Sequence, residues 1–151
     1  MLPQSKQVIV MDLVSSASGA TGTGRVDTLG FDFVSIDTVM ATSNATNPPT
    51  RLRLMESDDT VVTNFANIVP MTGGTATSAT VGFVIPDSRT DTTTLYGIKM
   101  NLDLKGRKRW LRIEVSPADT NQITSSVANL HRGDEAPVNA TDAGVLVLAE
   151  G

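Results

Sequence analysis

Alternating apolar and polar residues make 95–116 the most informative stretch of the chain. Apolar side chains occupy every second position from Tyr96 to Leu104 and again from Leu111 to Val115. A short segment that contains Gly106 separates the two runs. Period-two alternation on both sides of a glycine-containing turn predicts an antiparallel hairpin.

The turn of this hairpin fixes its expected register. Gly106 suits the first central position of a type II′ turn, which requires a positive φ. Counting outward from the turn pairs the apolar residues on one face and charged residues on the other: Leu102 with Leu111, Met100 with Ile113, Ile98 with Val115, and Lys99 with Glu114. A slip by one residue would destroy this agreement, so the pattern favours a single register.

Further strands are predicted before and after the hairpin, between loops rich in Gly, Pro, Asn, Ser and Thr. They lie at 6–14, 25–29, 31–41, 51–57, 81–85 and 122–131. The apolar positions of 31–41 change face, which indicates a bulge or a strand covered on both sides. The weak alternation of 122–131 is typical of an edge strand or a subunit-facing strand. Residues 61–69 fit one helical turn or a short edge strand.

The acidic pair Asp58 and Asp59 allows two interpretations. Calcium loops need spaced oxygen ligands and a turn glycine, which this stretch lacks. A turn or a helix start capped by an aspartate fits the residues better.

Together these elements predict an all-β fold, an antiparallel β-sandwich or jelly-roll-like barrel with extended terminal segments. We expect a single β-rich domain over residues 1–151, with a flexible loop at 15–24 and a C-terminal arm from about 132. Aromatic residues make up only 4% of the chain, so the core must be mainly aliphatic.

Several classes of function find no support in the residues. A net charge of −4 argues against general nucleic-acid binding. No apolar run approaches a membrane span, and the first residues lack the apolar core of a signal peptide. His131 is the only histidine and there is no cysteine, so no histidine or thiolate metal site is expected. Without a Gly-x-Ser-x-Gly elbow or another catalytic constellation, we expect no enzyme and no cofactor.

The predicted turn is the most basic part of the chain. Lys105, Arg107, Lys108, Arg109 and Arg112 supply five of the 12 basic side chains. Three interpretations remain open: a tip kept soluble by charge, a docking point for an acidic protein surface, or a polyanion site. The neighbouring Trp110 is expected to pack against another sheet or subunit, with carbohydrate stacking as an alternative. The candidate partner contacts are therefore Lys105, Arg107, Lys108, Arg109 and Trp110.

Apolar segments near both ends of the chain suggest contacts between subunits. The run within 6–14 is nearly continuous, so a neighbour could cover its second face. Residues 145–148 are all apolar, and they dock either on their own domain or on a neighbouring subunit. The candidate interface residues are Val8, Val10, His131, Arg132, Val145, Leu146, Val147 and Leu148.

Three stretches of this sequence resemble a family of small tailed-phage virion proteins, the capsid decoration or cement proteins. They are residues 31–37 with 56–65, residues 103–111, and the ending 133–138 with 144–145. The resemblance implies a β-rich homotrimer that sits on the capsid surface of the virion after synthesis in the host cytoplasm. It implies the major capsid protein as partner, with neighbouring capsid subunits clamped together and no nucleic acid or membrane bound.

Two other functions remain as alternatives. The chain could be a structural component of a phage tail or neck. It could also be a host-surface binding module for carbohydrate, in which Trp110 and the Asp- and Asn-rich loops carry the binding.

Overall fold

The fold is seen in a computed structural model, which describes residues 5–16, 20–42, 51–68, 95–116 and 122–132. The described part contains eight strands and one short 3-10 helix. These are β1 Ser5–Ser16, β2 Gly22–Asp27, β3 Phe33–Thr42, β4 Arg51–Ser57, η1 Val62–Asn64, β5 Ala66–Asn67, β6 Tyr96–Asp103, β7 Trp110–Ser116 and β8 Gln122–His131.

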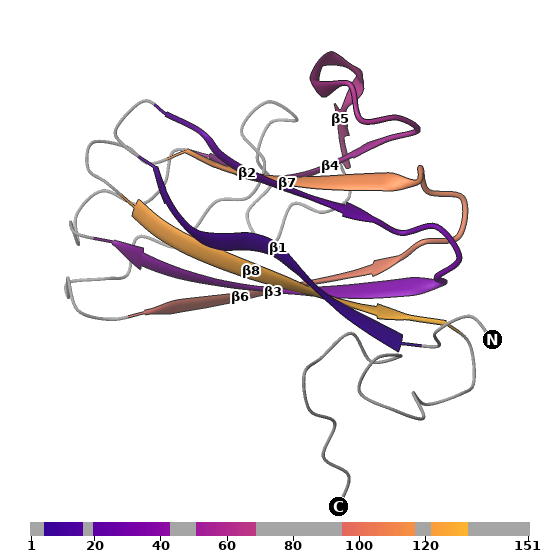
Figure 1. Ribbon diagram of the computed structural model, residues 1–151, viewed down its shortest axis with the longest axis horizontal. Coiled ribbons are helices and arrows are strands. Elements are labelled where there is room, and N and C mark those ends of the chain that lie inside the picture. The colour runs from indigo at the N-terminus through magenta and orange to yellow at the C-terminus, as the bar shows by residue number, and fades with distance from the viewer. Residues whose placement is uncertain (1–4, 17–19, 43–50, 69–94, 117–121, 133–151) are drawn as a thin grey trace, which may run out of the picture.

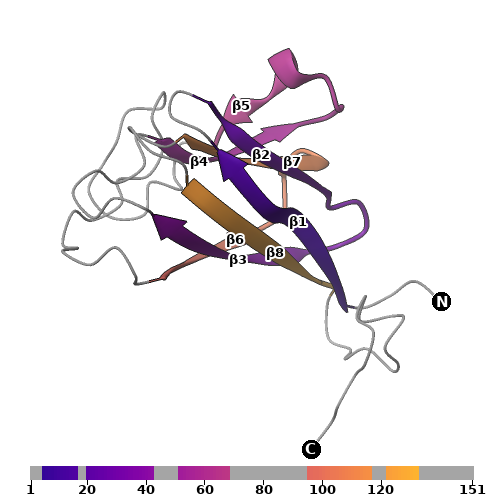
Figure 2. The same cartoon turned by 60° about the vertical axis from the view of Figure 1, so that its left-hand side comes forward.

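The strands form two four-stranded antiparallel sheets that face each other, as Figures 1 and 2 show. Sheet A has the order β1-β8-β3-β6, and sheet B has the order β2-β7-β4-β5. The predicted all-β sandwich is therefore confirmed. Among the residues with described structure, η1 is the one helical element, and no helix is long and apolar enough to cross a membrane.

The pairing follows a jelly roll. The first strand pairs with the eighth, the second with the seventh, the third with the sixth and the fourth with the fifth. The chain thus runs out through β1–β4, turns at 58–65, and returns alongside itself through β5–β8, and this long ribbon is folded into two sheets. Consecutive strands therefore alternate between the sheets, except β4 and β5, which are neighbours in sheet B.

The predicted hairpin at 95–116 is wrong in its pairing. β6 and β7 exist and keep the expected alternation, but β6 pairs with β3 in sheet A and β7 pairs with β2 and β4 in sheet B. Leu102 and Leu111 both face the core, from opposite sheets. Lys99 accordingly pairs with Asp37 rather than with Glu114. Alternation defines which face of a strand is apolar, but it does not define the neighbouring strand.

Gly106 has the predicted positive φ, at 73°, but in a different turn. The Arg107 amide donates to the Leu104 carbonyl at 3.0 Å, which makes Gly106 the third residue of a four-residue turn. A positive φ at this position is the requirement of a type II turn. This turn carries the chain from one sheet to the other.

Other predictions are corrected at strand positions. β8 is a central strand between β1 and β3, rather than an edge. β3 pairs with β6 and β8 in continuous register, so it has no bulge. Of the predicted loop at 15–24, both ends belong to strands, because β1 continues to Ser16 and β2 starts at Gly22. The predicted strand at 81–85 and the predicted C-terminal arm beyond residue 132 lie outside the described residues.

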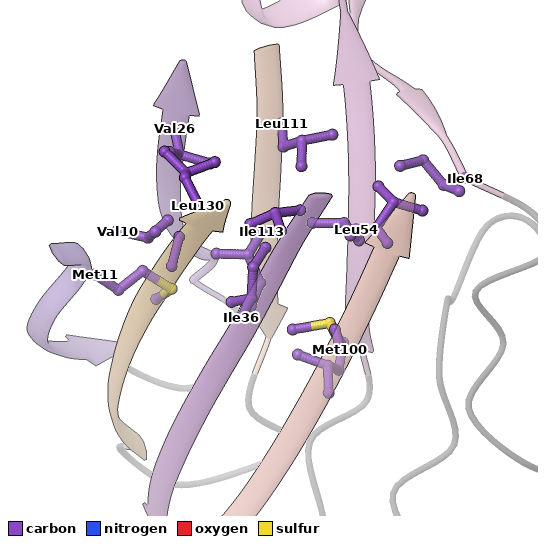
Figure 3. Packing of buried hydrophobic residues seen from close by; sticks show 14 of the residues in the cluster. Val10, Met11, Val26, Ile36, Leu54, Ile68, Met100, Leu111, Ile113 and Leu130 are labelled. Carbon is purple, nitrogen blue, oxygen red and sulfur yellow. The ribbon is translucent and has the colours of Figure 1, made fainter. Parts of the chain in front are cut away.

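The core lies between the sheets and is mainly aliphatic. Ile36, Met100 and Leu130 of sheet A face Leu54, Leu111 and Ile113 of sheet B (Figure 3). Each of these side chains is at most 3% exposed. A buried hydroxyl pair, Thr38 with Ser126 at 2.8 Å, satisfies two of the polar side chains that β3 and β8 bring into this layer.

Candidate functional site

Two chain crossings between the sheets lie side by side at one end of the sandwich. Residues 28–32 connect β2 to β3, and residues 104–109 connect β6 to β7. The Thr28 amide donates to the Arg109 carbonyl at 3.0 Å, and the Leu104 amide donates to the Asp32 carbonyl at 2.9 Å. We call this end of the sandwich the crossover end. The turn after β4 lies there because Ser57 pairs with Trp110, and the end of β8 lies there because His131 pairs with Phe33. Hydrogen bonds between the crossings give it a fixed shape.

The crossover end brings together most of the predicted contact residues. Lys105, Arg107, Lys108, Arg109 and Trp110 come from the second crossing and the start of β7. His131 and Arg132 come from the end of β8, where the His131 ring lies 6.2 Å from the Phe33 ring. The sequence suggested two separate groups, one for a partner and one for a neighbouring subunit. The fold places the partner group at the same end of the molecule as His131 and Arg132 of the subunit group.

Most of the basic turn is paired with carboxylates from other strands. Arg107 binds Glu56 at 3.3 Å, Lys108 lies 3.5 Å from Asp58, and the Arg109 guanidinium binds Asp27. The Lys108 amide also donates to Glu56 at 3.3 Å. Much of the positive charge is therefore balanced within the chain. These pairs connect the second crossing to β2 and to the turn after β4.

Some basic residues at this end have no ion pair in the part of the chain that the structure describes. Lys105, Arg132 and Lys6 are exposed, and Lys6 lies opposite Leu130 near the end of β8. The role of the predicted contact residues stays a prediction. Lys105, Arg132 and Lys6 are thus the basic residues at this end whose charge no carboxylate of the described residues balances in an ion pair.

Asp27 and Arg109 form a bidentate pair. The Arg109 Nε donates to Asp27 Oδ1 at 2.9 Å, and Nη2 donates to Oδ2 at 2.6 Å. This hydrogen bonding to Arg109 lowers the pKa of the Asp27 carboxyl below its ordinary value of 3.8, aided by the Leu29 amide and opposed by partial burial. The same pair raises the pKa of Arg109. The guanidinium also lies 5.3 Å from the centre of the Trp110 ring, so the half-buried tryptophan is held against the pair.

Replacing Asp27 by asparagine should change how stability depends on pH. Because the pKa of Asp27 is lowered on folding, its stabilisation is present above the ordinary aspartate range and is lost as the pH falls through the folded value. Asp27→Asn should cost about 0.5–1 kcal/mol at pH 7, since the pair is partly exposed. It should also flatten the acid side of the stability curve below about pH 4. Urea unfolding at several pH values measures both effects; an unchanged acid slope would contradict them.

Asp59 organises the turn after β4. Its Oδ1 accepts the Val61 amide at 2.8 Å, and its Oδ2 accepts the Asn64 side chain at 2.8 Å. The bond from Asn64, the largest cause, lowers the pKa of the Asp59 carboxyl. The interpretation as an aspartate-capped turn is therefore confirmed, with η1 and the two-residue β5 following it. Within the described residues no group of three or more His, Cys, Asp or Glu is placed to hold a metal ion.

The remaining interface candidates differ in accessibility. Val10 is 9% exposed and lies in the core cluster, and the half-buried Val8 packs against that cluster. Their part in a subunit contact stays a prediction, although their own domain already covers much of both side chains. Val145, Leu146, Val147 and Leu148 lie outside the described residues.

Sequence reasoning missed a buried charge cluster on the outer face of sheet B. Glu114 of β7 binds Arg53 of β4 through one carboxylate oxygen and Arg112 through the other, the latter at 2.8 Å. The Glu114 side chain is 5% exposed. Phe65 lies over Arg112, with 5.7 Å from the guanidinium to the ring centre, and thus helps to cover the cluster. The alternation of β7 did not predict this cluster, because charged residues on the outer face of a strand are ordinarily expected to be exposed to solvent.

No protein-family model and no curated protein matches this sequence. Among solved structures, a chain of the infectious bursal disease virus Gx strain is similar at 13% identity and a TM-score of 0.48, over 88% of this chain and 33% of that one. The VP2 subviral particle of the same virus is similar at 12% identity and a TM-score of 0.46, over 85% of this chain and 33% of that one. The STIV MCP is similar at 8% identity and a TM-score of 0.39, over 91% of this chain and 50% of that one.

This chain therefore spans about a third to a half of the length of the chains to which it is similar. At these identities and TM-scores the likeness carries no argument about function. The jelly-roll assignment stands on the strand pairing of this chain itself.

Proposed function

We propose that this protein is a virion structural protein that binds the outside of a phage capsid. In this proposal it stabilises the capsid as a homotrimer that clamps neighbouring major capsid subunits. The capsid surface of the virion is its location, after synthesis in the host cytoplasm, and it has no catalytic activity.

One observation carries the proposal. Two of the three stretches that resemble capsid decoration proteins, 31–37 with 56–65 and 103–111, lie within the described residues, and their segments are far apart in the sequence but meet at the crossover end. The Leu104 amide donates to Asp32, and Arg107 binds Glu56, so each stretch touches another. Residues that set a family's binding surface are expected to gather in this way. A jelly roll alone would not suffice, because viral capsid domains and lectins share it.

The crossover end has physical properties that suit a clamp. Its crossings are fixed by backbone hydrogen bonds and by the Asp27–Arg109 pair, so little conformational entropy is lost when a partner binds. Lys105 and Lys6 supply exposed charge for an acidic partner surface. Such rim charges mainly affect the association rate and the salt dependence of binding.

The test is binding to capsids that lack the protein, measured by co-sedimentation at several salt concentrations. Replacing Lys6 and Lys105 together by serine should weaken binding about 3- to 10-fold at low salt and reduce its salt dependence. Lys6→Arg with Lys105→Arg is the control, because it keeps both positive charges at the same exposed positions.

Two outcomes would contradict this account. Failure of the unmodified protein to bind capsids would reject the capsid function, and binding to tails or necks, or to glycans in a screen, would favour one of the alternatives. Equal binding by the serine and the arginine double variants would reject the crossover end as the contact surface.

A further inference from the structure

The outer face of sheet A exposes several large apolar side chains. The register places Ile9 opposite Val127, Val39 opposite Ser125 and Phe33 opposite His131, all pointing away from the core. Ile9 is 65% exposed, Ile123 47%, Val39 45% and Phe33 37%. Four of the eight exposed large hydrophobic residues in the described chain thus share this one face. Such a concentration on one sheet marks an interaction surface.

Four polar side chains on the same face form a connected row, although the buried Ser35 hydroxyl beside them has no hydrogen-bond partner among the described residues. Gln7 of β1 donates to Asn129 of β8 at 3.1 Å, and Asn129 donates to Asp37 of β3 at 3.1 Å. Asp37 in turn lies 3.4 Å from the Lys99 ammonium of β6. This row crosses all four strands of sheet A. These groups would stay paired if an apolar segment covered the face. The cover would therefore not incur the free-energy penalty of burying them without hydrogen-bond partners.

The chain itself offers an apolar segment of suitable length and position. β8 belongs to sheet A and ends at His131, and residues 145–148 are Val, Leu, Val and Leu. The intervening residues 132–144 can span about 45 Å when extended. That exceeds the length of β8, which is about 33 Å for ten residues. The segment can therefore reach any point on this face or on the same face of an adjacent molecule.

We propose that Val145–Leu148 of one copy packs on the outer face of sheet A of the next copy. Ile9, Phe33, Val39 and Ile123 are exposed in the described chain, and the proposal assigns their cover to the segment of a second copy, in keeping with the homotrimer. Each copy then donates one segment and receives one, a head-to-tail contact that closes into a ring of three. This inference rests on the homotrimer of the proposed function, and it names the surfaces that hold the trimer together.

The first experiment measures mass in solution by sedimentation and native mass spectrometry over a range of concentrations. Leu146→Ser with Leu148→Ser, and separately Ile9→Ser with Val39→Ser, should each raise the trimer dissociation constant at least tenfold. Leu29→Ser with Val62→Ser is the matched control, because these residues are 65% and 57% exposed but lie away from the face. Circular dichroism establishes that each variant is folded.

The second experiment uses the absence of cysteine from the chain. Copies carrying Val39→Cys are mixed with copies carrying Leu146→Cys and treated with a short bismaleimide. Cross-linked dimers should form in the mixture at a yield well above that of either variant alone.

The outcomes separate this inference from the proposed function. A wild-type trimer that survives Leu146→Ser with Leu148→Ser, or a mixture that gives no extra cross-link, would overturn this inference alone. A wild-type monomer at all concentrations would overturn both the inference and the homotrimer on which it rests, whatever the capsid-binding result.

Discussion

Replacing Glu114 by glutamine is expected to lower the free energy of unfolding by about 3–5 kcal/mol. The carboxylate is 5% exposed and is held between Arg53 and Arg112. Glutamine keeps the shape but removes the charge that both guanidinium groups bind, and the Arg112 guanidinium, which Phe65 covers, loses its carboxylate partner. Loss of one partner from a buried ion pair is costly because the remaining charge is not solvated.

Asp37→Asn is the matched control for this prediction. It also converts a carboxylate to an amide beside a basic residue, but Asp37 and Lys99 have side chains 46% and 61% exposed. Its cost should be at most about 1 kcal/mol. Urea unfolding at a fixed protein concentration compares the two variants. Equal destabilisation would show that burial of the Glu114 cluster does not determine its contribution.

Gly24→Ala is the second large effect, with an expected cost of about 3 kcal/mol or more. A Cβ atom at this position would lie 2.1 Å from the Val10 carbonyl oxygen and 2.5 Å from Met11 Cγ. The nearest atom is backbone, so no rotamer change can relieve the contact. β1 of sheet A and β2 of sheet B would therefore have to move apart.

Gly97→Ala provides the control for the glycine substitution. Gly97 lies in β6 without a positive φ, and an added Cβ would meet nothing within 4 Å. Its effect should lie within about 0.5 kcal/mol of zero. Thermal unfolding of both variants checks the pair; a Gly24 variant as stable as the Gly97 variant would contradict the close approach of β1 and β2.

The sequence patterns predicted strand faces better than strand partners. Thr124, Ser126, Ala128 and Leu130 share the buried side of β8, as alternation indicates, yet β8 is central in its sheet. The small and polar residues that suggested an edge lie mostly on the solvent-facing side of β8. Ser126 lies on the buried side, where its hydroxyl group pairs with that of Thr38. Nothing in the alternation of β6 and β7 distinguishes a hairpin from two strands that face each other across a core. That choice depends on long-range pairing, because β3 and β8 lie about 90 positions apart in their register.

The candidate site was predictable in its residues but not in its electrostatics. The basic turn is evident in the sequence, whereas its acidic partners come from β2, β4 and the turn after β4. Only the jelly-roll topology brings Asp27 and Glu56 to Arg109 and Arg107. The apolar residues on the outer face of sheet A could not be grouped from the sequence either. Ile9, Val39 and Ile123 belong to three strands whose order in the sheet the sequence does not reveal.

The capsid itself provides the most direct measurement. Capsids without the protein, reconstituted with an excess of it and imaged by electron cryomicroscopy, should show three-lobed density on the outer surface between neighbouring major capsid subunits. The crossover end should face the capsid. Bare capsid surfaces, or density confined to the neck or tail, would contradict the account.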